Sequence, residues 1–581
     1  MKKISAKTYF LKKTFDFFVV GMLMVLLLFM WTLYRGPISV PYLKPYIIQA
    51  LNYDESEYSV NIGDVNVEFV RSIQPLRITA NDISLKKKND NFSIQAPKLY
   101  LSFSLRALLN GIIAPSDVSL EKPTAYIFAN YGIEETDKNN ISKKKLEFYI
   151  RQLNASLNNY NSEDKIYPES YVNNITIKDG EIEFHEVELG RKWILSDVNF
   201  EFNRNLVNME VNANALVNIN DKIASTGFES IYHGTSDKLE LEVYFSDLIL
   251  SDLMHSFNET TQADTLSVLS IEVPLNGKID TTINLADILK HPDDAESYLS
   301  SAIEGIDFEI DGGKGYIAFD GNDKYNYEID EVVLSGQVTG GIDEILIENA
   351  DFKMGGQKAQ IGFHASGLET YLFDKSLNDL AIRFTAQIPE FPLSHLSQFW
   401  PRYVAEPAWL WCKNGLVSGI AKNGKFVFDF GYDKTNDKWG LLNLDGIADL
   451  HDGDLFYLEG MPLIHNLYGV AHFSPQNISI DIQKGFSDGV NITDGNVNIY
   501  DLNKDDNFIS IYVIGNSTIT DALNLINNPP LEFATEMGLN PKDIEGNVDV
   551  KLKLDFELRQ DLDPKDIKVD VDADLHNISI T

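Results

Sequence analysis

The sequence predicts a mainly β protein: an N-terminal transmembrane helix, then a long series of β-strands with a few short helices. An unbroken apolar run near the N-terminus is long enough to cross a bilayer. From residue 60 onward, hydrophobic residues recur at every second position, which is the side-chain period of a β-strand. The chain has 581 residues, far more than one core usually holds, and so predicts several domains or one extended body.

Composition excludes several classes of protein. The 49 basic and 86 acidic residues give a net charge of -37. Nucleic acid binding needs a basic surface, so nucleic acid is not expected as a partner. The single cysteine, Cys412, rules out an intramolecular disulfide and a cysteine-based zinc site. We expect no cofactor and no metal.

The first element is a membrane anchor over residues 15–34, preceded by a cytoplasmic N-terminus, residues 1–14. Twenty helical residues span about 30 Å, the thickness of the hydrocarbon core. Two interpretations compete: an uncleaved anchor and a cleaved signal peptide. The run is long, and no small-residue cleavage site follows it, which favours the anchor. The anchor residues are Phe17, Phe18, Val19, Val20, Leu23, Val25, Leu26, Leu27, Leu28, Phe29 and Trp31.

The orientation of the anchor follows from charge. Five lysines and no acid lie within the first 13 residues, so the short N-terminus is expected to stay in the cytoplasm. The remainder, with a net charge of about -42, is then exported. The chain is therefore predicted to cross one membrane once, with its body on the exported side.

The body is predicted to be built from one-sided strands. The clearest is residues 548–558, where six apolar side chains alternate with charged ones. A second example is predicted as a hairpin that turns at Lys178-Asp179-Gly180. The apolar positions assigned to one face are Val65, Val67, Phe69, Ile175, Ile177, Ile182, Phe184, Ile478, Ile480, Ile482, Val548, Val550, Leu552, Leu554, Phe556 and Leu558.

Helices and turns are few. Acidic-Gly and Gly-Gly turn signals recur at Asp311-Gly312-Gly313, Thr339-Gly340-Gly341, Asp452-Gly453, Asp488-Gly489 and Asp494-Gly495. Helical patterns occur at Ser104–Asn110, Ser142–Tyr160, Asp247–Phe257, Leu285–Leu289, Asp294–Ile303, Leu393–Val404 and Thr520–Ile526. The predicted segments after the anchor are an N-terminal β segment at 35–130, a polar insertion at 131–170, and an elongated β region at 171–581.

Two architectures fit the one-sided strands. Stacked β-sandwiches would pack each apolar face against another sheet. Alternatively, one long curved sheet would line a groove, and an apolar face of that size needs an apolar occupant in water. Lipid tails are the natural occupant for a chain tied to a membrane.

Several passages resemble the AsmA-like family. In Leu76–Ile127, a strand pair leads into Pro97-Lys98-Leu99, a leucine-rich turn ending in Gly111, and a strand closing on Pro123. The segment Tyr171–Phe202 resembles a second characteristic sequence of that family. Phe399–Ile420, with its Trp-Pro, Trp and Gly pattern, and the stretch that follows to Leu502 resemble the YhdP-type subgroup.

The resemblance implies an inner-membrane-anchored, bridge-like lipid transporter. Its hydrophobic β-groove would carry phospholipid toward the outer membrane and support outer-membrane lipid homeostasis. The implied partners are phospholipid acyl chains, the inner membrane, and the outer membrane or one of its proteins. The alternative is a membrane-anchored scaffold that assists outer-membrane protein assembly. The resemblance also implies a bacterial inner membrane crossed once, with the body in the periplasm. Family members are usually about twice as long, so we expect this chain to be truncated at its C-terminal end, to be a split gene product, or to be a shorter relative. In a lined groove, Leu554→Glu is expected to block acyl chains without unfolding the protein.

Enzyme motifs are missing from the sequence. There is no His-Glu-x-x-His pair, no Gly-x-Ser-x-Gly elbow and no phosphate-binding Gly-x-x-x-x-Gly-Lys-Ser/Thr. The best metal candidates are Asp449, His451, Asp452 and Asp454, but they lack the register of a calcium loop. Cys412 is predicted to be a small hydrophobe in an aromatic strand. Trp400, Trp409 and Trp411 fit core packing better than ligand stacking. We therefore expect no catalytic residue.

The orientation is testable by fusing a reporter that is active only in the cytoplasm after residue 300. Because the lysines retain the N-terminus, the reporter should be exported and remain silent. Strong reporter activity would contradict the predicted orientation.

Overall fold

The computed structural model describes residues 6–51, 58–70, 76–87, 92–109, 111–112, 114–129, 171–186, 191–205, 207–219, 222–251, 269–290, 295–319, 325–374, 376–399, 406–504, 506–529, 531–559, 562 and 564–580. The predicted insertion at 131–170 and its helix Ser142–Tyr160 lie outside these residues. The chain divides into two compact units, residues 1–263 with 276–304 and residues 264–275 with 305–581.

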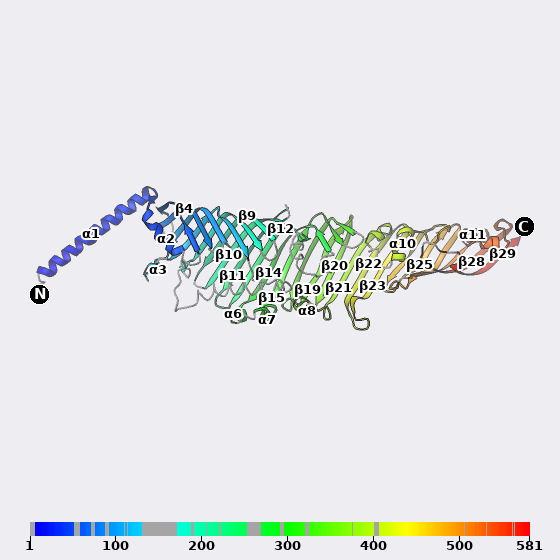
Figure 1. The fold of residues 1–581 in the computed structure, drawn as a ribbon. Coiled ribbons are helices and arrows are strands. Elements are labelled where there is room, and N and C mark those ends of the chain that lie inside the picture. The colour runs from blue at the N-terminus through cyan, green and yellow to red at the C-terminus, as the bar shows by residue number, and fades with distance from the viewer. Residues whose placement is uncertain are drawn as a thin grey trace. The chain divides into compact units, whose positions relative to one another are not determined.

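One long helix opens the chain, and the other helices among the described residues are short (Figure 1). The helix α1 spans Ala6–Arg35, and Lys13–Arg35 is long and apolar enough to cross a membrane once. The remaining α-helices are α2 (Lys44–Leu51), α3 (Leu105–Leu109), α6 (Ala286–Lys290), α7 (Ala295–Ala302), α8 (Leu368–Asp374), α9 (Leu396–Phe399), α10 (Glu406–Gly415), α11 (Ile519–Ile526) and α12 (Phe533–Glu536). Single 3-10 turns are η1 (Pro41–Leu43), η5 (Leu393–His395), η6 (Pro541–Asp543) and η7 (Pro564–Asp566).

The strands of the first unit follow one another along the chain. They are β1 (Ile38–Ser39), β2 (Tyr58–Asn61), β3 (Val65–Phe69), β4 (Leu76–Lys87), β5 (Phe92–Phe103), β6 (Pro115–Glu121), β7 (Thr124–Ala129), β8 (Asn174–Glu186), β9 (Arg191–Arg204), β10 (Asn208–Ile219), β11 (Lys222–His233), β12 (Lys238–Ile249) and β14 (Pro274–Asn284). Consecutive strands from β8 to β12 pair antiparallel, whereas β8 runs parallel to β6 and β7.

The second unit repeats the consecutive antiparallel pattern from β18 to β29. Its strands are β13 (Leu269–Glu272), β15 (Ile303–Gly312), β16 (Gly315–Phe319), β17 (Tyr325–Ile329), β18 (Glu331–Thr339), β19 (Glu344–Met354), β20 (Gln357–Ser366), β21 (Ala381–Pro392), β22 (Leu416–Asp433), β23 (Lys438–Leu455), β24 (Ile464–Phe473), β25 (Asn477–Ser487), β26 (Val490–Tyr500), β27 (Phe508–Thr518), β28 (Ile544–Glu557) and β29 (Lys568–Ile580). In the described residues, 26 strands belong to one sheet, and β13, β16 and β17 form a second. The prediction of a mainly β fold is confirmed.

Several predicted turns are bulges inside long strands. The hairpin predicted at Lys178-Asp179-Gly180 is wrong, because β8 runs through these residues with a register shift between Ile177 and Gly180. Asp179 has a φ of 51°. Asp452-Gly453 and Asp494-Gly495 likewise lie inside β23 and β26. An Asp in the left-handed region suits a bulge as well as a tight turn, so the dipeptide alone does not distinguish them.

The helix predictions fare unevenly. The patterns at Ser104–Asn110, Leu285–Leu289, Asp294–Ile303 and Thr520–Ile526 correspond to α3, α6, α7 and α11. Asp247–Phe257 is wrong at its start, because β12 continues to Ile249. The stretch predicted as an aromatic strand around Cys412 is α10.

Candidate functional site

An unbroken line of apolar side chains crosses nine neighbouring strands of the first unit. Residues that face each other across paired strands project to the same side of a sheet, so the register identifies the members. We call this line the N-terminal apolar row and the side that carries it the inner face. The row consists of Val65, Ala80, Leu99, Leu120, Ile177, Phe200, Ala213, Phe228 and Val243.

The opposite side of the same strands, the outer face, is polar. One position along, the partners are Ser119, Thr176, Glu201, Asn212, Glu229 and Glu242. Lys278 Nζ lies 3.1 Å from a Glu242 carboxylate oxygen, which offsets part of the charge on this face. The sheet in this unit is therefore one-sided, as the alternation in the sequence predicts.

The second unit carries a longer line of the same kind. The C-terminal apolar row crosses twelve strands, from β15 and β18 through β28, with no polar side chain among its members. It consists of Ile310, Leu334, Ala350, Ile361, Ala386, Phe426, Gly446, Phe473, Ile478, Ile499, Ile509 and Phe556.

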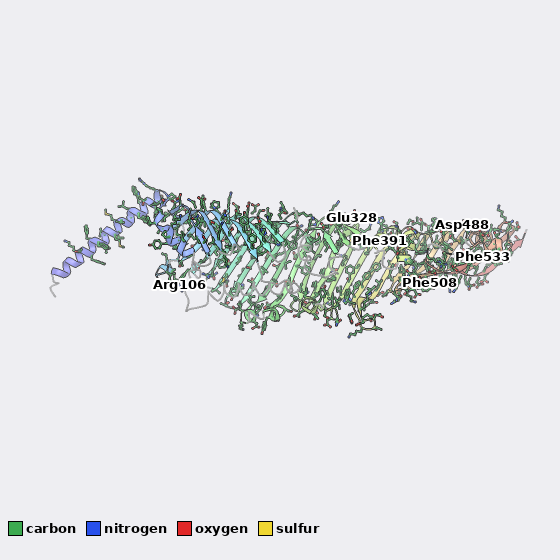
Figure 2. All side chains as sticks on the ribbon, viewed as in Figure 1. Arg106, Glu328, Phe391, Asp488, Phe508 and Phe533 are labelled. Atoms are coloured by element: carbon green, nitrogen blue, oxygen red, sulfur yellow. The ribbon has the colours of Figure 1, made fainter. Side chains whose placement is uncertain are left out.

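Burial varies along both inner faces. In the first unit, the β3–β5 end is buried against Leu33 of α1, Val40, and Ile47 of α2. In the second unit, the β24–β28 end is buried in a cluster with Leu458, and Phe533 of α12 (Figure 2) packs against it. Most large inner-face side chains of β8–β12 and β15–β22 are half-buried. Tyr232 of β11 and Val332 of β18 are exceptions, because they are buried in further clusters with Ile288 of α6 and with Val273, respectively. Each unit therefore has buried clusters and a stretch of inner face where the large apolar side chains are only half-buried.

A small apolar cavity lies beneath α11 at the covered end of the second unit. It has a volume of about 120 Å³. Thr518 caps the helix by accepting a hydrogen bond from the Asp521 backbone N–H at 3.1 Å. The cavity is lined mainly by aliphatic side chains, which from α11 are Ile519, Ala522, Leu523, Leu525 and Ile526, and from β28 are Val548, Val550, Leu552 and Leu554.

The structure places the predicted lining residues on the inner face and brings them together in two sets. The first set joins β3 to β8, where each residue faces the next on the neighbouring strand, in the order Val67, Ile78, Leu101, Val118 and Ile175. The second set joins β25 to β28, where Ile480 faces Val497, which faces Ile511, which faces Leu554. Val65, Val67, Ile478, Ile480, Ile482, Val548, Leu552, Leu554, Phe556 and Leu558 are buried. Phe69, Ile175, Ile177, Ile182, Phe184 and Val550 are half-buried.

Sequence reasoning missed a half-buried aromatic part of the second unit's inner face. Phe384 of β21 faces Phe428 of β22, and their ring centroids are 5.9 Å apart. Phe363 of β20 faces Phe384 on its other side. The period-two signal is present here, in residues 382–388 and 426–430, and would have identified these positions.

The predicted anchor residues lie on α1. Among the side chains that the structure describes there, Phe17, Phe18, Val20, Leu23, Val25, Leu27, Leu28, Phe29 and Trp31 are exposed, and Val19 is half-buried. Leu26 lies outside the described side chains. An apolar helix exposed on nearly all sides suits a lipid surrounding.

The acidic residues considered as metal ligands lie on β23, where other side chains form hydrogen bonds with them. The hydroxyl of Ser418 donates to Asp454 at 2.7 Å, and His465 Nδ1 lies 2.9 Å from the other carboxylate oxygen. The hydrogen bond from Ser418, then that with His465, lowers the pKa of Asp454. Asp452 accepts from Tyr468, and Asp449 accepts from the Asn423 amide at 2.8 Å. In the described part of the chain, no three such side chains are grouped to hold a metal ion.

Cys412 and two tryptophans belong to α10 and its packing. Burial raises the pKa of the Cys412 thiol to about 12, so the thiolate form is suppressed. The indole N–H of Trp409 donates to the Ser397 carbonyl at 3.0 Å. The indole N–H of Trp411 donates to the Tyr457 carbonyl at 3.4 Å. Trp400 lies outside the described residues.

A Leu→Ala substitution should destabilise the protein more at a buried position of the inner face than at a half-buried one. Leu554 is 0% exposed, so Leu554→Ala should lower the free energy of unfolding by about 2–5 kcal/mol. The matched change Leu444→Ala, at a half-buried inner-face position opposite Phe428, should cost less than half as much. Denaturant unfolding, together with hydrogen exchange of β23 and β28, measures the loss of unfolding free energy in both variants. Equal losses would contradict the difference in packing between the two positions. A glutamate at position 554 should likewise unfold β28, contrary to the expectation from the sequence.

No curated protein matches the chain. The model of the family described as YhdP protein matches residues 299–581, which include β15 to β29 and the whole C-terminal apolar row. The resemblance to a YhdP-type protein is thereby confirmed, since residues 299–581 of the chain match the YhdP family.

Proposed function

We propose that this chain is an inner-membrane-anchored lipid-transfer protein whose inner face carries phospholipid acyl chains toward an outer membrane. The observation that carries the proposal is the C-terminal apolar row, which crosses twelve strands without a polar side chain. The family match is consistent with this function. The proposed activity is binding and conduction, not catalysis.

The length of the row supports several lipids in series. Eleven strand spacings of about 4.8 Å give roughly 50 Å along the row. One leaflet of a bilayer core is only about 15 Å thick, so a single acyl chain covers a fraction of the row. A face of this length suits passage from site to site better than it suits one fixed ligand.

The partial exposure of aromatic side chains on the inner face supports a ligand that is amphiphilic, such as a phospholipid. Phe363, Phe384 and Phe428 are half-buried by neighbours within the unit, which leaves apolar surface for acyl chains. Phospholipid headgroups would remain in water at the open side because burying them would carry a desolvation cost. A sheet with a fully packed inner face would have no such surface.

The proposed route begins at the inner membrane and runs through the periplasm. α1 supplies a single span, and the lysines before it favour a cytoplasmic N-terminus. Phospholipid, the inner membrane, and an outer membrane or one of its proteins are the proposed partners.

A charge on the accessible inner face tests the proposal. A photo-crosslinking residue at Phe363 should capture phospholipid in cells, and adding Phe384→Glu should abolish capture. A carboxylate placed against hydrocarbon costs several kcal/mol, while an unoccupied half-buried site can hydrate it. The protein should therefore remain folded.

The matched control is Gln387→Glu, which adds a charge three residues away on the exposed outer face of β21. It should leave lipid capture unchanged. Absence of lipid adducts at Phe363 in the otherwise unaltered protein would contradict the proposed function. Equal losses from both glutamates would contradict the assignment of the inner face.

A further inference from the structure

The segment that follows α1 is held directly against the end of the span. Leu33, in the last turn of α1, is 2% exposed and shares a buried cluster with Val40 and with Ile47 of α2. The backbone N–H of Val40 donates to the Val65 carbonyl at 2.9 Å, which attaches this segment to β3. The helix α2 therefore lies one layer of side chains from the point where the chain leaves the membrane span.

The same segment presents aromatic rings outward. Tyr42 of η1 is 68% exposed and Tyr46 of α2 is 51% exposed, whereas Ile47 beside them is fully buried. Tyr42 and Tyr46 are four residues apart and so fall on one side of a helical turn. Tyrosine is enriched at the level of lipid headgroups, because its ring is apolar and its hydroxyl is polar.

Charge along the segment points to the same partner. Residues 17–53 contain no Asp or Glu, although the whole chain has 86. Arg35 and Lys44 are the basic residues of this stretch, and the Arg35 guanidinium lies 3.9 Å from the Trp31 ring centroid. An acid-free, basic and aromatic surface is complementary to phospholipid headgroups, and the acidic remainder of the chain is not.

We propose that η1 and α2 form a second membrane contact, with Tyr42 and Tyr46 inserted among the headgroups of the bilayer that α1 spans. Extended chain advances at most about 3.6 Å per residue, so Tyr42, seven residues past Arg35, lies within roughly 25 Å of the end of the span. Burial of Ile47 and Val40 against β3 and β4 couples this contact to the sheet. The contact holds the buried β3–β5 end of the first unit against the membrane surface, where acyl chains would leave the bilayer. The inference rests on α1 spanning the membrane.

Depth-dependent quenching in nanodiscs containing anionic phospholipid tests the contact with the full-length chain. Cys412 is the one cysteine of the sequence, so a Cys412→Ala background allows single labelling sites to be introduced elsewhere. An NBD fluorophore at Tyr46→Cys should lose most of its emission when the lipids carry a nitroxide near the headgroup. The same fluorophore at Tyr512→Cys, an outer-face tyrosine of β27, should keep its emission.

A third label separates the two possible failures. At Val25→Cys, within α1, emission should be lost when the nitroxide is near the acyl chain ends. If the label at 25 is quenched and the label at 46 responds no more than the label at 512, the second contact is wrong. If the label at 25 is not quenched, the anchor is wrong, and with it the basis of the inference.

Discussion

The register between neighbouring strands is the constraint on which the rest of this structure depends. Each pairing places facing residues on the same side, so an alternating sequence becomes a continuous apolar face only when every strand is aligned with the next. A slip of one residue would turn a whole strand over. Bulges at Asp179, Asp452 and Asp494 absorb the extra residues of long strands, and the apolar members of β8, β23 and β26 stay on the inner face on both sides of each bulge.

Short helices close the ends of the apolar faces. At the start of the first unit, Val40 and Ile47 cover β3–β5. In the second unit, Leu525 of α11 and side chains around Tyr457 cover β24–β28, and cavities of about 120 Å³ and about 420 Å³ lie there. An apolar face without cover or ligand is unfavourable in water. Half-buried large side chains remain on the inner faces of β8–β12 in one unit and of β15–β22 in the other. In this account, these stretches are where lipid binds.

Most of the fold could be predicted because its signal is local and repeated. The alternation in residues 548–558 corresponds to β28, and the apolar run near the N-terminus corresponds to α1. The predictions that were wrong concern features that depend on contacts between residues far apart in the sequence. The helix α10 is short and rich in Trp, so its sequence resembles an aromatic strand, and the packing of Ala408 and Cys412 decides the outcome. Whether Leu554 is covered or accessible is decided by α11, which packs onto β28 from outside that strand, and alternation cannot reveal it.

The amount of phospholipid that the purified chain retains shows directly whether lipid occupies the inner face. The full-length protein would be extracted from membranes in mild detergent, transferred to a detergent-free polymer belt and analysed for phosphorus and by mass spectrometry. An apolar face of this extent predicts several phospholipids per chain beyond those bound by a single-span protein treated in the same way. Equal lipid content in the two proteins would contradict lipid occupancy of the inner face.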